Sequence, residues 1–170
     1  VLVMTSGNLS EEPIATDNAE ARQRLSILAD AFLMHDRDIR TRCDDSVVRV
    51  FDPPAGQTAV PPRLYPLRRS RGYAPDPLSI PLEAPPLLAC GPELKNTFCL
   101  TRERYAFLSH HIGDMENYET LQSFQDGVRH FEHMFRIRPT ALAHDLHPDY
   151  LATRYARERA ERENLPLIGV

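Results

Sequence analysis

The chain has 170 residues and a mass of 19.4 kDa, enough for one ordinary domain or two small ones, and its 42% hydrophobic and 26% charged content argues against disorder. Its net charge of −4 provides no general attraction to nucleic acid or to a membrane. No apolar run has the roughly eighteen residues of a membrane span, no signal peptide is visible, and the cysteines have no CxxC spacing, which favours a reducing cytoplasm over disulfides or a thiolate zinc site.

The first 62 residues are predicted to contain a strand, a helix and a second strand, the order of one edge of an α/β layer. The apolar run "VLVM" at residues 1–4 predicts the first strand. The helix is expected over residues 17–34, with Thr16 or Asp17 as its N-cap. The β-branched run "SVVRVF" predicts the second strand. The helix is expected to bury one face, made by Leu25, Leu28, Ala29 and Phe32.

Proline marks an internal boundary, because eleven of the fifteen prolines lie between Pro53 and Pro92. Proline lacks a backbone donor and disfavours helix before it, so residues 63–85 are predicted to form an extended connection with one short edge strand, "RLYPLR". The chain is thereby divided into residues 1–62 and 86–170. It begins with "VLVM" and ends with "LPLIGV", both apolar runs of buried-strand type, which indicates a fragment of a longer protein.

Residues 86–170 are predicted to fold in the order β-β-β-α-β-α-β. This is the order of a ribonuclease-H-like half domain, as in sugar kinases and actin, in which hairpin turns approach nucleotide phosphates. The first helix is expected over residues 118–135, with an apolar stripe of Leu121, Phe124, Val128, Phe131 and Phe135. The second helix lies in "PDYLATRYARERAER", with Pro148 in its first turn. The expected strands are "LLAC", "KNTFCLT", "YAFLSHHI", "TALAHDL" and "LPLIGV".

Two short polar segments in the first part carry candidate anion-binding residues. In "TSGN", Ser6 and Asn8 follow the expected first strand, where side-chain donors and exposed backbone N–H groups can hold phosphate or carboxylate. In "RCDDSVVR", Ser46 opens the next strand, with Arg42 and Arg49 beside it. An ordinary polar turn and a solvated strand entry are the alternative interpretations, and each segment taken alone favours them.

Lys95 is the only lysine in a chain with nineteen arginines, and it lies in the turn "GPELKN". A coding bias toward arginine explains the nineteen but not the exception. Since a compact ammonium is not equivalent to a planar guanidinium in a tight phosphate site, Lys95 is predicted to face an anionic ligand. A surface lysine retained by chance is the alternative.

The seven histidines are scattered over expected strands and helices, and no metal site is assigned within the chain. His110 and His111 are adjacent on an expected strand, so their side chains point to opposite faces and cannot both ligate one metal ion without a bend. His144 and His147 straddle a strand end, where His147 and Asp145 are expected to fix the strand-to-helix turn.

Six motifs, in chain order, extend over nearly the whole chain: "VMTSGNLSEEPI", "HDRDIRTRCDDSVVR", "RRSRGYAP", "GPELKNTFCL", "LSHHIGDMEN" and "DLHPDYLATRYA". Taken together, they resemble the middle of a HypF-type carbamoyltransferase. The resemblance implies an α/β fold: the C-terminal part of a YrdC-like domain, followed by the N-terminal part of a ribonuclease-H-like domain of the threonylcarbamoyl-transfer class.

The resemblance implies a cytoplasmic enzyme that takes part in the maturation of nickel–iron hydrogenases. Such enzymes use carbamoyl phosphate and ATP to form carbamoyl-adenylate. They pass the carbamoyl group to the C-terminal cysteine of the partner HypE, and the product is the precursor of the cyanide ligands of the active-site iron. A membrane is not implied and nucleic acid is not expected as a partner. Zinc and a second metal are expected only in segments outside residues 1–170.

Carried over residue by residue, the resemblance assigns Ser6 and Asn8 to a Ser-x-Asn phosphate turn. Ser46 matches the serine that opens the last phosphate-side strand, and Arg42 and Arg49 are implied charge partners for the bound nucleotide or phosphate.

Lys95 is implied to be the catalytic cation near the acyl-adenylate, and it is also assigned to phosphate binding. The turn reads "ACGPE" where sugar kinases and actin carry Asp-x-Gly, and this departure argues against a phosphoryl-transfer kinase. Because the acceptor is a thiolate of the partner, no nucleophile of this chain is required, and its cysteines are expected to be buried or incidental.

Two other functions remain open. A tRNA threonylcarbamoyladenosine-forming protein uses the same folds on separate chains, but it needs a basic RNA-binding surface, and the negative net charge argues against one. A non-catalytic binding fragment is the second alternative, and the presence of two partial domains favours it.

Overall fold

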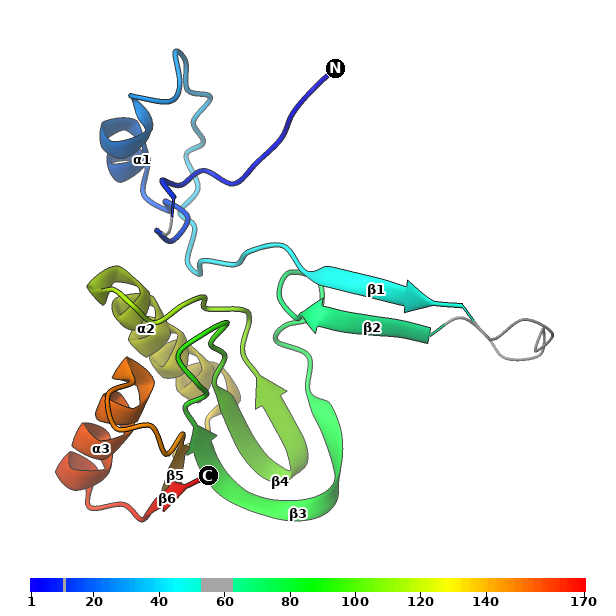
Figure 1. Ribbon diagram of the computed structural model, residues 1–170, viewed down its shortest axis with the longest axis vertical. Helices are drawn as coiled ribbons and strands as arrows, with labels where there is room; N and C mark the ends of the chain where they lie inside the picture. Colours follow the sequence, from blue (N-terminus) through cyan, green and yellow to red (C-terminus); the bar gives the residue numbers. More distant parts are fainter. Residues whose placement is uncertain (11, 53–62) are drawn as a thin grey trace.

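The computed structural model describes residues 1–10, 12–52 and 63–170. Within these ranges the chain is an α/β protein, and no helix there is long and apolar enough to cross a membrane. The elements follow in the order α1 (Asn18–Leu25), β1 (Val47–Phe51), β2 (Arg63–Arg68), β3 (Leu78–Ala89), β4 (Cys99–Leu108), α2 (Tyr118–Phe135), β5 (Ala141–His144), α3 (Leu151–Glu163) and β6 (Leu167–Gly169) (Figure 1).

The N-terminal segment has less regular structure than its sequence predicts. Residues 1–4 do not form the expected strand and their side chains are exposed, because no described neighbour pairs with their backbone. Asp17 is the predicted N-cap, and its carboxylate accepts the N–H groups of Ala19 and Glu20, both at 2.8 Å. The helix ends at Leu25 instead of residue 34. It has no buried residue, so packing does not support further turns.

The strands predicted from "SVVRVF" and "RLYPLR" are confirmed as β1 and β2. They pair antiparallel, with Phe51 opposite Arg63 and a register shift between Val47 and Val48. This two-stranded hairpin projects to one side of the molecule, between the α1 segment and the larger sheet (Figure 1).

The larger sheet has the strand order β4-β3-β5-β6. β3 and β4 pair antiparallel, whereas β3–β5 and β5–β6 are parallel and are connected through α2 and α3. β4 is sharply bent (Figure 1), with Glu103 at φ 56° in its middle. The residues that flank β4 are hydrogen-bonded to each other: the Ser109 N–H donates to the Phe98 carbonyl at 2.8 Å. The two strands expected from "KNTFCLT" and "YAFLSHHI" are therefore the two arms of this one element.

α2 occupies the predicted range, and its predicted stripe faces the core. Phe124, Val128 and Phe131 are buried, and the Phe98 ring of the sheet packs edge-on against Phe124 and Phe131 at 5.6 and 5.1 Å. α3 begins later than expected: Pro148 precedes the N-cap, Tyr150, and is not in the first turn.

Candidate functional site

The "GPELKN" turn joins β3 to β4 in a conformation that its residue types explain. Gly91 has φ 60°, and a Cβ there would lie 2.2 Å from the Thr97 carbonyl oxygen, so only glycine fits. Lys95 also has positive φ, 52°. Its N–H donates to the Asp114 carboxylate at 2.7 Å.

The segment after β4 holds this turn in place. The Asn96 N–H donates to the Gly113 carbonyl at 2.8 Å, and the Ile112 N–H donates back to the Asn96 carbonyl at 2.9 Å. The buried Asn96 amide donates to the carbonyls of Cys90 and Pro92 at 3.1 and 2.6 Å. The turn and the "HHIGD" loop therefore form one hydrogen-bonded unit.

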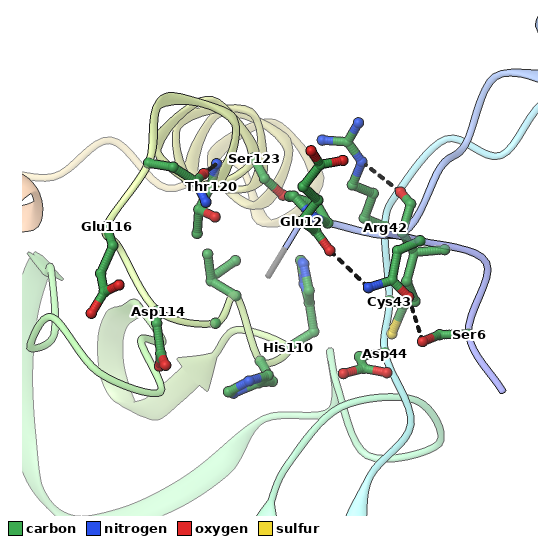
Figure 2. A pocket seen from close by; sticks show the side chains of 17 residues that line it. Ser6, Glu12, Arg42, Cys43, Asp44, His110, Asp114, Glu116, Thr120 and Ser123 are labelled. Atoms are coloured by element: carbon green, nitrogen blue, oxygen red, sulfur yellow. Dashed lines mark hydrogen bonds between the residues drawn. The ribbon is translucent and has the colours of Figure 1, made fainter. Parts of the chain in front are cut away.

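A cavity of about 630 Å³ lies between the N-terminal segment and this loop, and it brings together three of the predicted site residues. Figure 2 shows Ser6 and Arg42 on one wall, with His110, Asp114 and Glu116 facing them. The Ser6 hydroxyl donates to the Asn8 side-chain oxygen.

The predicted anion-binding groups in this cavity already have protein partners. The Asn8 amide donates to the carbonyls of Leu9 and Glu12 at 3.0 and 2.9 Å. The Arg42 Nε donates to the Ile14 carbonyl at 3.0 Å. In this conformation, Asn8 and Arg42 hold the shape of the N-terminal segment.

The cavity also has an acidic lining. Glu12, Asp44, Asp114 and Glu116 line it together with a single arginine, Arg42.

Neutral imidazole forms part of the same wall. Burial, followed by the neighbouring His111 and His130, lowers the pKa of His110 to about 4, so His110 is neutral near pH 7. Burial and the nearby Arg68 lower the pKa of His111 as well, against Asp44 and Asp114, which raise it. His110 and His111 therefore add hydrogen-bonding groups to the wall without adding positive charge.

Lys95 lines a different cavity, of about 650 Å³, beside the β1–β2 hairpin. Arg68, Arg69 and Tyr73 lie in its wall, and His111 lines both cavities. The structure therefore places Lys95 apart from Ser6, Asn8 and Arg42, with His111 between the two spaces.

Ser46 and Arg49 have local contacts. The Ser46 hydroxyl donates to the Arg71 carbonyl at 2.9 Å and accepts the Ser70 N–H at 2.8 Å, which ties the entry of β1 to the "RGYAP" turn. The Arg49 guanidinium lies 5.1 Å from the centre of the Phe51 ring on the same strand.

Cys90 and Cys99 do not resemble activated nucleophiles. Burial raises the pKa of Cys90 to about 12 and that of Cys99 to about 11, which disfavours the thiolate. Cys43 lies in the wall of the first cavity, 3.5 Å from the Ser70 hydroxyl. In the part of the chain that the structure describes, no group of three or more His, Cys, Asp or Glu side chains is arranged to hold a metal ion.

The sequence analysis did not identify Asp114. It placed His110 and His111 on opposite faces of a strand, whereas both follow the end of β4 and line the same cavity. All three come from "SHHIGD", directly after the bent β4. The signal that was available is positional: polar residues at the end of a strand, followed by a glycine, often line a site. The bend in β4 that turns this loop toward the N-terminal segment leaves no comparable mark in the sequence.

Comparison with protein families gives two matches in chain order. The model described as "HypF Kae1-like domain" matches residues 82–170, and the Sua5/YciO/YrdC model described as "Telomere recombination" matches residues 1–58. Together they confirm the predicted succession of a YrdC-like segment and a HypF-type ribonuclease-H-like segment.

Similar proteins carry the carbamoyltransferase name. The chain is 47% identical over 170 residues to carbamoyltransferase HypF2 of Cupriavidus necator and 46% identical over 173 residues to carbamoyltransferase HypF of Rhodobacter capsulatus. All of this chain is covered in both alignments, but only 20% and 22% of those relatives.

Solved structures show the same fold. A full-length HypF described as phosphate- and nucleotide-bound matches with a TM-score of 0.82 and 43% identity, over 98% of this chain and 24% of that one. The HypF of T. kodakarensis matches with a TM-score of 0.87 and 36% identity, over 98% of this chain and 21% of that one. The chain therefore spans between a fifth and a quarter of the length of these proteins.

Proposed function

This chain belongs to the HypF family, and from that premise we propose that it works as the central part of a longer ATP-dependent carbamoyltransferase. The observation that carries the proposal is that a YrdC-like match and a HypF Kae1-like match occur in one chain, over residues 1–58 and 82–170. In the proposed reaction, water hydrolyses carbamoyl phosphate to carbamate and phosphate, and the carbamate oxygen then attacks the α-phosphorus of ATP to form carbamoyl-adenylate with release of pyrophosphate. The thiolate of the C-terminal cysteine of HypE then attacks the carbamoyl carbon, and AMP leaves.

The candidate residues are proposed to serve different half-reactions. The leaving AMP carries negative charge, and a fixed cation near it stabilises the transition state. Lys95 lines a cavity with Arg68 beside it, and no carboxylate within the described ranges forms an ion pair with its ammonium. Ser6, Asn8 and Arg42 are proposed to serve the adenylation half-reaction. A bound anion there would replace their present protein partners and would need to offset the acidic lining.

The proposal is tested by carbamoyl-phosphate-dependent exchange of pyrophosphate into ATP in the longer protein. Asn8→Ala should slow the exchange by roughly tenfold, because it removes a donor from the adenylation site. Asn18→Ala is the control, since the Asn18 amide likewise donates to a backbone carbonyl, that of His35, but away from both cavities. Exchange that requires threonine and bicarbonate instead of carbamoyl phosphate would indicate the tRNA-modifying function, and no exchange with either would refute the adenylation step.

Lys95 separates the two half-reactions. Lys95→Ala should leave pyrophosphate exchange unchanged but slow carbamoylation of the HypE cysteine. Lys95→Arg should recover only part of the rate, because a planar fork does not replace a point charge. Equal loss of both half-reactions would mean that Lys95 supports folding and not transfer.

A further inference from the structure

Lys95 occupies a backbone conformation that its residue type does not favour. Its φ of 52° lies in the left-handed region, where a Cβ makes the backbone less stable. Three other described non-glycine residues have positive φ: Arg136 and Asn164 are helix C-caps, where this conformation is usual, and Glu103 is at the bend of β4. Lys95 therefore needs a contact from elsewhere in the fold to keep this conformation.

That contact comes from Asp114. Its carboxylate accepts the Lys95 N–H at 2.7 Å, and the carbonyl of the residue before it, Gly113, accepts the Asn96 N–H at 2.8 Å. The Met115 N–H closes the same unit by donating to the Glu93 carbonyl at 2.9 Å. Since a bond to a carboxylate is stronger than one to a neutral carbonyl, Asp114 is the strongest single hold on the Lys95 backbone.

The opposite side of the turn is held by a helix. The N-cap of α3, Tyr150, provides no side-chain cap, and the Leu151 N–H donates instead to the Glu93 carboxylate at 3.1 Å. The turn is thus fixed between the "HHIGD" loop and the start of α3. Any change in the backbone conformation of Lys95 is therefore opposed by these contacts.

We infer that Asp114 is a positioning residue for carbamoyl transfer: its carboxylate fixes the Lys95 backbone and so directs the Lys95 ammonium into the cavity beside the β1–β2 hairpin. The inference rests on the proposed function for its activity readout only. Asp114 acts through the main chain, because no ion pair joins its carboxylate to the Lys95 ammonium among the described residues. Its effect on the rate should therefore depend on the hydrogen bond more than on its charge.

Kinetics of the longer protein test the role in transfer. Asp114→Ala should lower kcat for HypE carbamoylation by roughly tenfold or more, with the KM for HypE unchanged. Asp114→Asn keeps an oxygen that accepts the Lys95 N–H, and it should retain most of the rate. In a Lys95→Ala background, Asp114→Ala should cause no further loss. Glu158→Ala, which removes an exposed carboxylate from α3, is the control and should be silent.

Two kinetic outcomes would overturn the inference. One is independent losses from Asp114→Ala and Lys95→Ala that multiply in the double variant. The other is an Asp114→Asn variant as slow as Asp114→Ala, which would mean that the charge matters instead of the hydrogen bond.

Amide hydrogen exchange of residues 1–170 tests the contact without any activity. The Lys95 amide should exchange at least about tenfold faster in Asp114→Ala than in the unmodified chain or in Glu158→Ala, and Asp114→Asn should keep most of the protection. An unchanged Lys95 exchange rate would overturn the positioning role even if transfer were impaired. If the Lys95 amide loses protection in Asp114→Ala but the longer protein does not form carbamoyl-adenylate, the proposed function is refuted and the positioning contact still stands.

Discussion

Residues 1–69 and residues 70–170 differ in how much of their surface they bury. No described side chain before Ser70 is buried, whereas the later part has a continuous apolar core that includes Phe98, Phe124 and Leu142. The early part nevertheless has many apolar side chains, among them Val48, Val50 and Leu64, and they are exposed. The difference is one of packing and not of composition.

The comparison teaches where the candidate site obtains its rigidity. Both walls of the cavity that Ser6 and Arg42 line have polar groups, but only the "HHIGD" wall is attached to the packed core, through the buried Ser109 and His110. The N-terminal wall, with Ser6 and Arg42, is held by local hydrogen bonds. We therefore expect substitutions to act on global stability in the later part and mainly on local structure in the earlier part.

The largest expected effect is that of Phe98→Ala. Phe98 is fully buried and contacts the rings of Phe124 and Phe131, so its truncation leaves a cavity and should cost about 3–5 kcal/mol in the free energy of unfolding. Urea unfolding followed by circular dichroism measures this. The control is Ile27→Ala, an exposed site in the early part, where a change within about 0.5 kcal/mol is expected. Comparable losses at both sites would break the comparison.

The second-largest expected effect is a loss of folding stability in acid, caused by a histidine of residues 70–170. His110 is 4% exposed and its pKa in the folded chain is about 4, below the ordinary value of 6.5. The unfolded chain therefore binds the proton more readily, so the stabilisation is complete above pH 6.5 and is lost as the pH falls toward 4. The shift in the His110 pKa corresponds to a loss of about 3 kcal/mol at most in the free energy of unfolding.

Urea unfolding at a series of pH values between 7 and 4 measures this loss, in the wild type and in His110→Asn. His110→Asn should have a lower stability at neutral pH but a flatter dependence on pH. A smaller slope should persist, because the pKa of His111 is lowered as well. An unchanged slope in His110→Asn would show that another group causes the acid sensitivity.

The sequence predicted the later part of the fold better than the earlier part, for the same physical reason. The stripe of Phe124, Val128 and Phe131 repeats with helical spacing and finds a sheet to cover, so periodicity and packing agree. The run "VLVM" and the face with Leu28 have equally apolar patterns, but the "VLVM" side chains and Leu28 are exposed and no residue of α1 is buried, and the strand and the longer helix do not form.

The candidate site was only partly predictable. Lys95 stood out by composition, and Ser6, Asn8 and Arg42 by their turn and charge, and the last three do share a cavity. Their roles remain predictions. The position of Asp114 against Lys95 depends on the bend of β4 and on a left-handed backbone, and no periodic pattern in the sequence encodes either of these.

Removing the N-terminal cap of a helix should have a smaller effect, and the effect should differ between α3 and α1. Glu93→Ala removes the carboxylate that accepts the Leu151 N–H of α3, and Asp17→Ala removes the N-cap of α1; each cap is worth about 1 kcal/mol. Because α3 buries Ala152 and Ala156 in the core, Glu93→Ala should lower the free energy of global unfolding.

Asp17→Ala should instead raise amide exchange within α1 and leave global unfolding unchanged, since α1 has no buried residue. Amide hydrogen exchange read residue by residue, combined with urea unfolding, distinguishes the two results. A global loss in Asp17→Ala would show that the early part folds cooperatively with the later one.

The smallest expected effect is a gain. Glycine adopts the φ of 52° found at Lys95 without the penalty of a Cβ, so Lys95→Gly should relieve strain that the rigid turn imposes. Part of this gain is offset by the greater freedom of glycine in the unfolded chain, which leaves a net stabilisation of about 0.5 kcal/mol. Lys95→Ala is the matched control, since it removes the ammonium but keeps the Cβ, and it should not be stabilised. Thermal unfolding of the wild type, Lys95→Gly and Lys95→Ala, measured side by side, resolves the difference.

If Lys95→Gly is no more stable than Lys95→Ala, the turn adjusts its backbone to the residue at position 95 and is no more rigid than the N-terminal segment. If it is more stable, the fold keeps a lysine at a position where glycine would be favoured, and a requirement for the ammonium accounts for it.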